Sequence, residues 1–215
     1  MNDDRVGRPP PAPPAGSRRR PWSEVVLVAL DFETTGLDLA ADSVISWGTV
    51  PLTSGGIELR DAAYQLVAPR RAPGVESIRV HELRPVDLAG APVLEAVAPS
   101  LHAALGGRFL VAWAAGIERA FLRRMFGGSK RSWRRRTIDV RDVLLAEAGG
   151  EADARRLTLE AACRRYGVPV ERTHHAFDDA LMTAELFLVL AARLGTTPTV
   201  RRLQRAAFAG SAHRR

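Results

Sequence analysis

The sequence predicts one α/β domain with a mixed five-stranded sheet flanked by helices. Three strand-like runs come first, over residues 25–30, 43–52 and 57–67, and helical and strand-like segments then alternate. The chain has 215 residues and is 46% hydrophobic, which is enough for a single domain with a sizeable core.

The first three strands are expected to pair as antiparallel hairpins. Residues 25–30 form an unbroken apolar run, which is typical of a buried strand. The second strand covers 43–52, and the Ser-Gly-Gly turn at 54–56 returns the chain into the third, over 57–67.

The second half of the chain is expected to alternate between helices and strands. Apolar residues recur at helical spacing after Ala91-Pro92, and Gly106-Gly107 ends that pattern. The expected elements are a helix over 91–105, a strand over 109–113, a helix over 117–126, a short strand over 137–140, a helical turn over 143–148, a helix over 157–166 and a long last helix to about 194.

The two ends of the chain are expected to be tails on a domain of residues 23–195. The first tail, 1–22, carries a proline run that cannot build a core, so we expect it to be disordered or extended. The second, 196–215, begins with the break signal Thr-Thr-Pro-Thr, after which 200–209 can form a short basic helix.

Positive charge is concentrated in these tails. The net charge is +3 over 1–22, −1 over 23–195 and +5 over 196–215. Basic tails commonly contact nucleic acid. The alternative is that thirty arginines against one lysine reflect a biased genome composition, with the tails serving only solubility.

Composition also indicates a compartment. No apolar run approaches the length of a membrane span, and the segment behind Arg18–Arg20 is too short and too early broken by Asp31 to be an export signal. The single cysteine, Cys163, excludes an internal disulfide and is expected to be packed. We therefore expect a cytoplasmic protein with no membrane partner.

Two carboxylates, Asp31 and Glu33, follow the first apolar run and indicate a metal site. Residues one apart on a strand project to the same side. Crowded carboxylates raise each other's pKa unless a cation lies between them, and oxygen ligands suit Mg²⁺ or Mn²⁺. Gly36 is expected to allow a sharp turn out of the strand.

The hexapeptide Asp31-Phe32-Glu33-Thr34-Thr35-Gly36 resembles the first motif of the DEDD exonucleases, the family that contains the proofreading epsilon subunit of bacterial DNA polymerase III. The third motif of that family has a histidine, four residues and an aspartate at the start of a helix. His174 and Asp179 match this spacing and resemble the histidine branch of the family. The resemblance implies a ribonuclease H-like fold.

The middle motif is the degenerate one. The family has His-Asn-Ala-x-Phe-Asp after an apolar strand. This chain has Trp113-Ala114-Ala115-Gly116-Ile117-Glu118, so that Glu118 stands at the position of the family's aspartate. The resemblance extends over about residues 24–194.

The resemblance implies a 3′-to-5′ exonuclease that uses two Mg²⁺ or Mn²⁺ ions. Asp31 would bridge both ions, Glu33 and Asp179 would complete the first site, and Glu118 would hold the second. His174 would take the proton from the attacking water, a role that suits a side chain titrating near neutral pH.

Three alternatives remain within this site. His175 would fit the three-residue gap to Asp179 that the tyrosine branch of the family uses, although the histidine branch favours His174. Asp139 or Asp142 could hold the second metal in place of Glu118. Asp178 is expected to be a supporting or solvated group.

The resemblance also implies contacts to the substrate. Thr34, Thr35 and Gly36 would line the terminal nucleotide, and His81, in Val-His-Glu-Leu, would shape the nucleotide pocket. The expected substrate is a single-stranded 3′ end releasing nucleoside monophosphates, with DNA favoured over RNA, and a polymerase or repair partner is possible. The other function class considered is a nucleic-acid-binding or scaffold protein with a degenerate site. The sequence leaves the oligomeric state open.

Two aromatic residues have alternative interpretations. The basic run 130–136 surrounds Trp133 and could bind phosphates while Trp133 stacks on a base, or it could be a solvated loop with one packed tryptophan. Trp113 is expected to fill the sheet edge near the site; the alternative is stacking on a substrate base.

Overall fold

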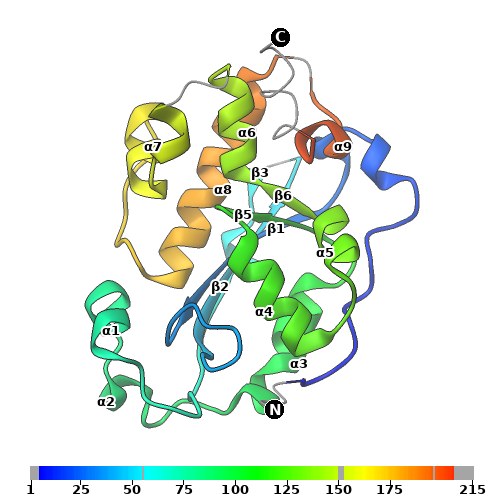
Figure 1. The fold of residues 1–215 in the computed structure, drawn as a ribbon. Coiled ribbons are helices and arrows are strands. Elements are labelled where there is room, and N and C mark those ends of the chain that lie inside the picture. The colour runs from blue at the N-terminus through cyan, green and yellow to red at the C-terminus, as the bar shows by residue number, and fades with distance from the viewer. Residues whose placement is uncertain (1–4, 55, 150–152, 196, 206–215) are drawn as a thin grey trace.

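A computed structural model describes residues 5–54, 56–149, 153–195 and 197–205, and shows a mixed sheet with helices on both faces (Figure 1). The strands are β1 (Leu27–Thr34), β2 (Val44–Thr53), β3 (Gly56–Ile57), β4 (Ala63–Leu66), β5 (Phe109–Ala112) and β6 (Thr137–Asp139). The α-helices are α1 (Val75–His81), α2 (Pro85–Leu88), α3 (Leu94–Leu105), α4 (Gly116–Phe126), α5 (Lys130–Arg136), α6 (Val140–Glu147), α7 (Leu159–Tyr166), α8 (Ala176–Arg193) and α9 (Val200–Leu203). The short 3-10 turns are η1 (Ser17–Arg19), η2 (Trp22–Glu24), η3 (Leu59–Asp61) and η4 (Asp153–Arg156).

The sheet order confirms the predicted fold class. Its strands run β3-β2-β1-β5-β6, and β4 pairs with β2 beyond this path. β1 is antiparallel to β2 and parallel to β5, and β5 is parallel to β6. The described residues therefore form a mixed sheet of six strands, one more than the sequence predicted.

The additional strand arises because the expected third strand is divided. β3 pairs with the end of β2, and β4 pairs with its first half, with η3 between them. Pro51 lies in β2 at the gap and has no N–H to donate to a ladder, while its carbonyl accepts from Glu58 N at 3.0 Å. The ladder is therefore interrupted at Pro51, and 58–62 turn away from the sheet.

β1 alternates between two hydrophobic cores. Leu27 and Ala29 belong to the cluster that includes α6, α7 and α8, while Val28 and Leu30 belong to the cluster with α3, α4 and α5. The strand was expected to end at residue 30, but it continues to Thr34. Residues 31 and 33 are therefore on the same face as 27 and 29, which is the face covered by α8.

α8 approaches the sheet closely because β2 carries a glycine at the crossing point. Gly48 pairs with Asp31 across the β1–β2 ladder. A Cβ built on Gly48 would lie 2.2 Å from the carbonyl oxygen of Ala176 and 2.4 Å from Phe177 Cα. Only glycine permits this contact, and it places the first turn of α8 beside Asp31.

Most of the other elements begin and end within a few residues of the predicted positions. α6 is a full helix where a single helical turn was expected, and α5 occupies the basic run for which no helix was predicted. α1 and α2 were not predicted. They lie in a proline-containing stretch at the lower left of Figure 1.

The described part of the N-terminal segment, residues 5–22, is extended and contacts the domain. Val6 N donates to Met125 O at 2.9 Å, and Gly107 N donates to Pro11 O at 2.9 Å. Trp22 packs edge-on against Phe187, with ring centroids 5.4 Å apart. The described residues also include the turn η1, and the assignment of 1–22 as a disordered or extended tail stays a prediction.

The C-terminal segment contributes one short helix to the described chain. α9 forms the first part of the basic helix expected over 200–209, and residues 206–209 lie outside the described residues. Pro21 and Thr199 form an isolated bridge between the two ends of the domain. The division of the chain at 22 and 195 stays a prediction. Among the described helices, none combines the length and apolar character that crossing a bilayer requires.

Candidate metal centre

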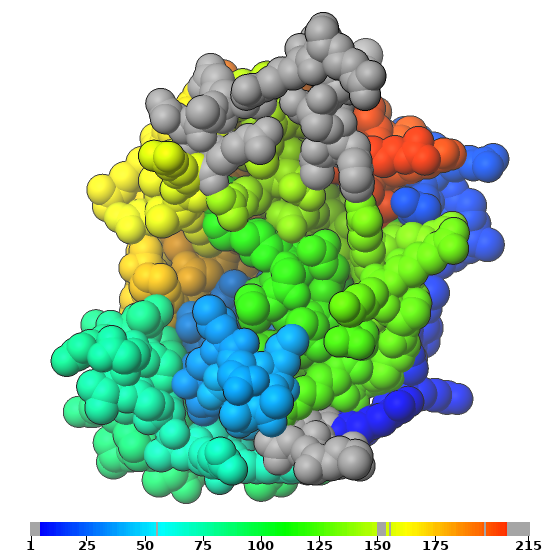
Figure 2. All heavy atoms as spheres, in the orientation of Figure 1, coloured from blue at the N-terminus to red at the C-terminus, as the bar shows by residue number. Residues whose placement is uncertain are grey.

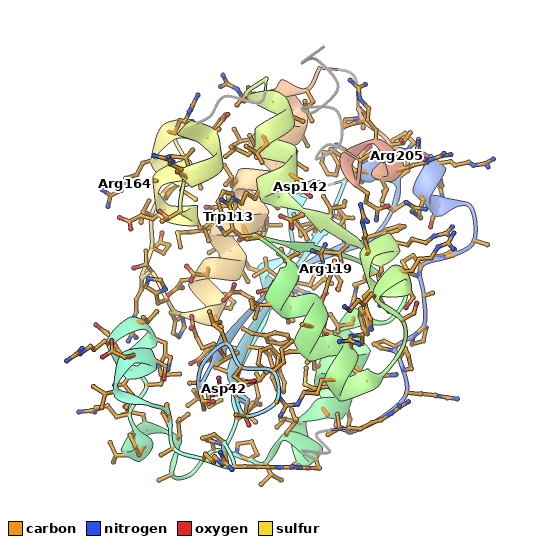
Figure 3. The ribbon with its side chains drawn as sticks, viewed as in Figure 1. Asp42, Trp113, Arg119, Asp142, Arg164 and Arg205 are labelled. Carbon is orange, nitrogen blue, oxygen red and sulfur yellow. The ribbon has the colours of Figure 1, made fainter. Side chains whose placement is uncertain are left out.

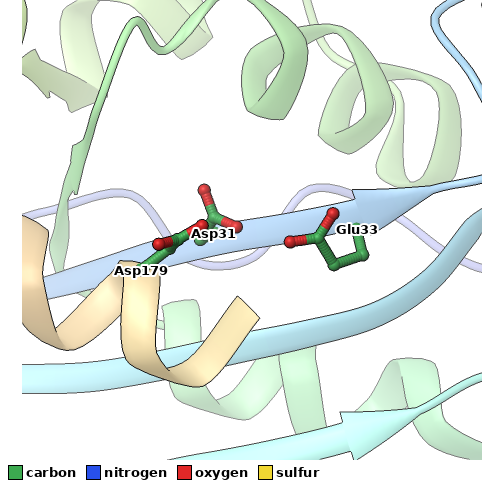
Figure 4. Close-up of side chains that lie close together, drawn as sticks. All are labelled: Asp31, Glu33 and Asp179. Carbon is green, nitrogen blue, oxygen red and sulfur yellow. The ribbon is translucent and has the colours of Figure 1, made fainter. Parts of the chain in front are cut away.

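Three carboxylates predicted as metal ligands converge between β1 and α8. Asp31 and Glu33 project from β1, and Asp179 projects from the first turn of α8, as Figure 4 shows. One oxygen from each can be chosen so that all lie within 4.8 Å of one another. Residues separated by nearly 150 positions in sequence are thus brought together, as predicted.

Burial and mutual repulsion raise the pKa of each carboxylate in this cluster. Burial, followed by the charges of Glu118, Glu33 and Asp179, raises the pKa of Asp31 well above its usual range. Burial and then the charge of Asp179 raise the pKa of Glu33 to about 8. The pKa of Asp179 rises to about 6, chiefly through burial. The charge and backbone N–H of His174 lower the pKa of Asp179, but they do not outweigh the effect of burial.

Glu118 lies beside this cluster. It occupies the first turn of α4, is only 6% exposed, and its charge is the largest contribution to the pKa of Asp31 after burial. Its Oε2 atom is buried and has no hydrogen-bond partner. A buried carboxylate oxygen without a partner is costly, which indicates that a bound group satisfies it.

Asp139 and Asp142 form a second acidic group next to Glu118. Asp139 ends β6 and its charge raises the pKa of Glu118, after the larger effect of burial. Asp139 Oδ2 is 3.9 Å from the guanidinium of Arg119, and its Oδ1 is buried without a partner. Figure 3 labels Arg119 on α4 and Asp142 on α6. Of the alternative ligands considered from the sequence, Asp139 is thus near Glu118, and Asp142 is near Asp139.

The residues present fit divalent cations. The converging donor set of Asp31, Glu33 and Asp179 consists of carboxylate oxygens, which suits Mg²⁺ or Mn²⁺, and Glu118, outside this group, has a buried carboxylate oxygen without a partner. A cation would also remove the repulsion that raises the pKa of each carboxylate.

His174 and His175 have different surroundings. His174 is exposed, adopts φ 58°, and donates its backbone N–H to Asp179 Oδ2 at 3.1 Å. Its charge lowers the pKa of Asp179, so its ring lies near that carboxylate. His175 instead lies against Tyr64, with ring centroids 4.4 Å apart, and its Nδ1 is 3.0 Å from Asp178 Oδ2.

The turn after β1 is stabilised by Asp42, a residue that the sequence did not single out. Thr35 Oγ1 donates to Asp42 Oδ1 at 2.8 Å and accepts from Ser43 N at 3.0 Å. A Cβ on Gly36 would lie 2.4 Å from Asp42 Oδ2. Gly36 is therefore required by the approach of Asp42. Figure 3 labels Asp42 in this turn.

The other residues predicted to contact the substrate are Thr34, Thr35 and His81, and they differ in the hydrogen bonds of their side chains. The Thr34 hydroxyl donates to Gly36 O at 2.8 Å, and both Thr34 and Thr35 are thus hydrogen-bonded within the turn. His81 ends α1 and is 3% exposed. Its Nδ1 accepts from Leu83 N at 3.0 Å, while its Nε2 is buried without a partner. The His174 charge lowers the pKa of His81 after the larger effect of burial, so the two rings are near each other.

The two tryptophans considered for base stacking differ in exposure. Trp133 is 2% exposed and its Nε1 donates to Gly127 O at 2.7 Å, so of its two alternatives the structure shows the packed tryptophan. Trp113 is partly buried and packs against the core on the α8 face. Cys163 is buried, as expected, and burial raises the pKa of its thiol to about 12.

Together, the ribonuclease H-like sheet and the acidic cluster at the β1–α8 contact define a class, that of exonuclease domains. Residues 28–187, about three quarters of the chain, match the RNase T exonuclease family. The chain belongs to this family, which confirms the resemblance found in its motifs.

Similar proteins agree with this assignment. The chain is 30% identical to a PolC-type DNA polymerase III of Thermotoga maritima over 171 residues, which cover 78% of this chain and 12% of that protein. It is 31% identical to a DNA polymerase III subunit epsilon-like protein of Rhodobacter capsulatus, over 79% of this chain and 24% of that protein. The chain thus spans a quarter or less of these relatives. Exonuclease X, solved with 5′ overhanging duplex DNA, shares the fold at TM-score 0.62 and 20% identity, covering 83% of this chain and 99% of that one.

Proposed function

We propose that this chain is a 3′-to-5′ exonuclease that hydrolyses phosphodiester bonds at single-stranded 3′ ends and releases nucleoside monophosphates. The observation that carries the proposal is the convergence of Asp31, Glu33 and Asp179 within 4.8 Å, beside the unsatisfied carboxylate of Glu118. Four acids from three distant segments have no structural reason to share a buried site unless cations bind there.

Two divalent ions bound by these four carboxylates would lower the pKa of a water molecule and offset charge on the phosphate oxygens. Asp31 would contribute to both ions, which is supported by the effect of the charges of Glu118 and Asp179 on its pKa. Glu33 and Asp179 would complete one site and Glu118 the other.

His174 is proposed as the general base. Residue 174 is exposed, and the bond from its backbone N–H to Asp179 supports a fixed position of the residue beside that carboxylate. Its ring would accept the proton of the attacking water. The ring of His175 is directed to Tyr64 and Asp178 instead, which supports His174 over His175.

DNA is the proposed substrate, and a polymerase is the proposed partner. The relatives are named as DNA polymerase III proteins, and Exonuclease X was solved with DNA. Thr34, Thr35, Gly36 and His81 are proposed to line the terminal nucleotide. The buried and unpaired Nε2 of His81 supports a contact to substrate.

A nuclease assay with matched substrates tests this function. The substrates are 5′-labelled single-stranded DNA, the same sequence as RNA, and a duplex with a 5′ overhang, each with Mg²⁺, Mn²⁺ or EDTA. We expect shortening from the 3′ end only with a divalent ion, fastest on single-stranded DNA, and no products with Asp31→Ala. The exposed carboxylate of Asp61 provides the control Asp61→Ala, which should retain full activity.

Three results would overturn the proposal. Full activity of Asp31→Ala would show that the candidate metal centre does not take part in hydrolysis. Shortening from the 5′ end would reverse the direction. Tight binding of nucleic acid with no products under any metal would support the alternative of a non-catalytic binding protein.

A further inference from the structure

A groove rich in arginine lies at the β6 edge of the sheet, away from the metal centre. It has a volume of about 1300 Å³, and eight of its 21 lining residues are arginines, with no aspartate or glutamate among them. We call it the basic groove; η1, α5, Arg201 of α9 and Arg205, which follows α9, line it. Figure 1 shows these three elements on the right-hand side of the molecule, and Figure 3 labels Arg205.

The basic groove is separate from the metal centre. Phe109, which lines the groove, begins β5 and pairs with Leu27 at the start of β1. Asp31 lies four residues further along β1, or roughly 13 Å at 3.3 Å per residue. The metal centre is thus near the carboxyl ends of the parallel strands, and the groove is near their amino ends.

Hydrogen bonds between distant segments fix the walls of the basic groove. Arg18 Nε donates to Gln204 Oε1 at 2.7 Å, and Gln204 Nε2 donates to Arg135 O at 2.8 Å. The buried Arg136 donates from Nη1 to Pro10 O at 3.0 Å. The N-terminal segment, α5 and α9 are therefore joined directly, so the groove is formed without a ligand.

The arginines of the basic groove repel one another. Burial lowers the pKa of Arg18, and the charges of Arg135, Arg201 and Arg205 lower it further. No acidic residue lines the groove, so its lining carries a net positive charge. A bound polyanion would relieve this repulsion.

The chemistry of the basic groove favours phosphates over bases. Guanidinium groups form paired hydrogen bonds to phosphate oxygens. The two aromatic residues of the lining, Phe109 and Trp133, are 1% and 2% exposed, so neither offers a face to a base. The volume also exceeds the roughly 300–1,000 Å³ of small-molecule pockets and suits a segment of a chain.

We propose that the basic groove binds the phosphate backbone of a nucleic acid strand, without regard to base sequence, as an anchoring surface distinct from the metal centre. The choice of nucleic acid among polyanions rests on the proposed nuclease function. Contacts to phosphate alone position a strand but do not discriminate its sequence. Figure 2 shows that side chains of α5, α9 and the N-terminal segment reach the surface along this edge.

Binding of the full chain to labelled 30-nucleotide strands, in EDTA, tests this proposal independently of hydrolysis. The groove variant is the triple substitution Arg131→Ala, Arg135→Ala and Arg205→Ala, all at exposed positions. The control, Arg60→Ala, Arg123→Ala and Arg164→Ala, removes the same charge from exposed sites outside the groove. At about 0.1 M salt we expect the groove variant to bind roughly 10- to 100-fold more weakly. The slope of log K against log[salt] should become less negative by about 2.

Homopolymers of different bases should lose affinity equally in the groove variant. Hydrolysis of thymidine 5′-monophosphate p-nitrophenyl ester, which is too small to reach the groove, should be unchanged in Mn²⁺, while digestion of long strands should slow. Equal losses in the groove and control variants would overturn the proposal, as would competition by polyglutamate that is stronger than competition by unlabelled DNA. If the groove variant loses binding but neither protein hydrolyses any substrate, the proposed function fails and the groove proposal stands.

Discussion

His174 and His175 are adjacent in sequence, but their surroundings direct them to different neighbours. The left-handed backbone of His174 directs it to the Asp179 side, while the extended backbone of His175, at the N-cap of α8, directs its ring to Tyr64. Spacing alone could not separate them, because each lies at a distance from Asp179 that a branch of the family uses. The contact with Tyr64 depends on β4, which no local pattern connects to residue 175.

The first prediction at this scale is that His174→Ala lowers kcat roughly 10²- to 10⁴-fold, the usual range for loss of a general base. His175→Ala is its matched control and should have a much smaller effect. A larger loss in His175→Ala would show that the general base is the second histidine.

A second residue-scale prediction concerns Glu118. Glu118→Gln keeps the size of the side chain but removes its charge, so we expect most activity to be lost. Glu118→Asp should retain part of it, because the shorter carboxylate keeps the charge but lies one methylene further from a site built for glutamate. Mn²⁺, which tolerates looser geometry than Mg²⁺, should rescue Glu118→Asp more than it accelerates the wild type.

Comparing Asp139→Asn with Glu118→Gln tests which of the two residues holds the second metal. Asp139 is buried beside Glu118, and burial raises its pKa to about 6. If Glu118→Gln retained wild-type rates in Mg²⁺ while Asp139→Asn lost them, Asp139 would be the second ligand and the alignment of the middle motif would be wrong.

At the scale of elements, the position of α8 depends on a glycine in β2. Gly48→Ala would place a Cβ 2.2 Å from the backbone of Ala176, so α8 or β2 must move. We expect the free energy of unfolding to fall by about 1–3 kcal/mol, as for other overpacked contacts. The free energy of metal binding should fall by more than this, because Asp179 moves away from Asp31. Thermal unfolding and titration with Mn²⁺ measure the two effects.

The control for this prediction is Gly90→Ala, since a Cβ there meets no atom within 4 Å. It should leave both stability and Mn²⁺ affinity close to those of the wild type. Unchanged Mn²⁺ affinity in Gly48→Ala would show that the β2–α8 contact does not position the ligand.

The elements that local patterns specify were predicted, and those set by distant contacts were not. The apolar periodicities of α3, α4 and α8 and the apolar runs of β1, β2 and β5 were enough to give the fold class. The division of β3 from β4 required the pairing partner of Pro51 to be known. The basic run of α5 lacks an obvious apolar stripe because one residue, Trp133, provides most of its burial.

For the whole molecule, the convergence of Asp31, Glu33 and Asp179 could be expected from the sequence because the motifs appear in order along the chain. The sequence did not reveal the roles of Gly48 or Asp42. The role of Gly48 depends on the contact between β2 and α8, and that of Asp42 depends on the contact between the two ends of the turn after β1. The basic groove as a whole was not predicted, since it forms from three segments that are distant in sequence. The sequence indicated its parts through the excess of positive charge in the two ends of the chain and through the basic run 130–136, for which phosphate binding was one alternative.

The last prediction is that stability depends on pH in opposite ways with and without metal. The pKa of Glu33 is raised to about 8, that of Asp179 to about 6, and those of Asp31 and Glu118 are raised, all chiefly by burial. A carboxyl group with a raised pKa favours the folded state while protonated. Its contribution is complete below the unfolded pKa of about 4 and is lost as pH rises through the folded value, here between about 4 and 8.

The metal-free protein should therefore lose stability as pH rises from 5 to 8, with a change in Tm of about 2–4 °C for each kcal/mol. Saturating Mg²⁺ or Mn²⁺ competes with these protons, so the increase in Tm on adding metal should be small at pH 5 and largest near pH 8. Asp31→Ala should flatten the pH dependence of the metal-free protein and reduce the effect of metal. Scanning calorimetry at pH 5, 6, 7 and 8, in EDTA and in metal, measures this; a metal-induced increase in Tm that is the same at every pH would show that the cations do not bind the buried carboxylates.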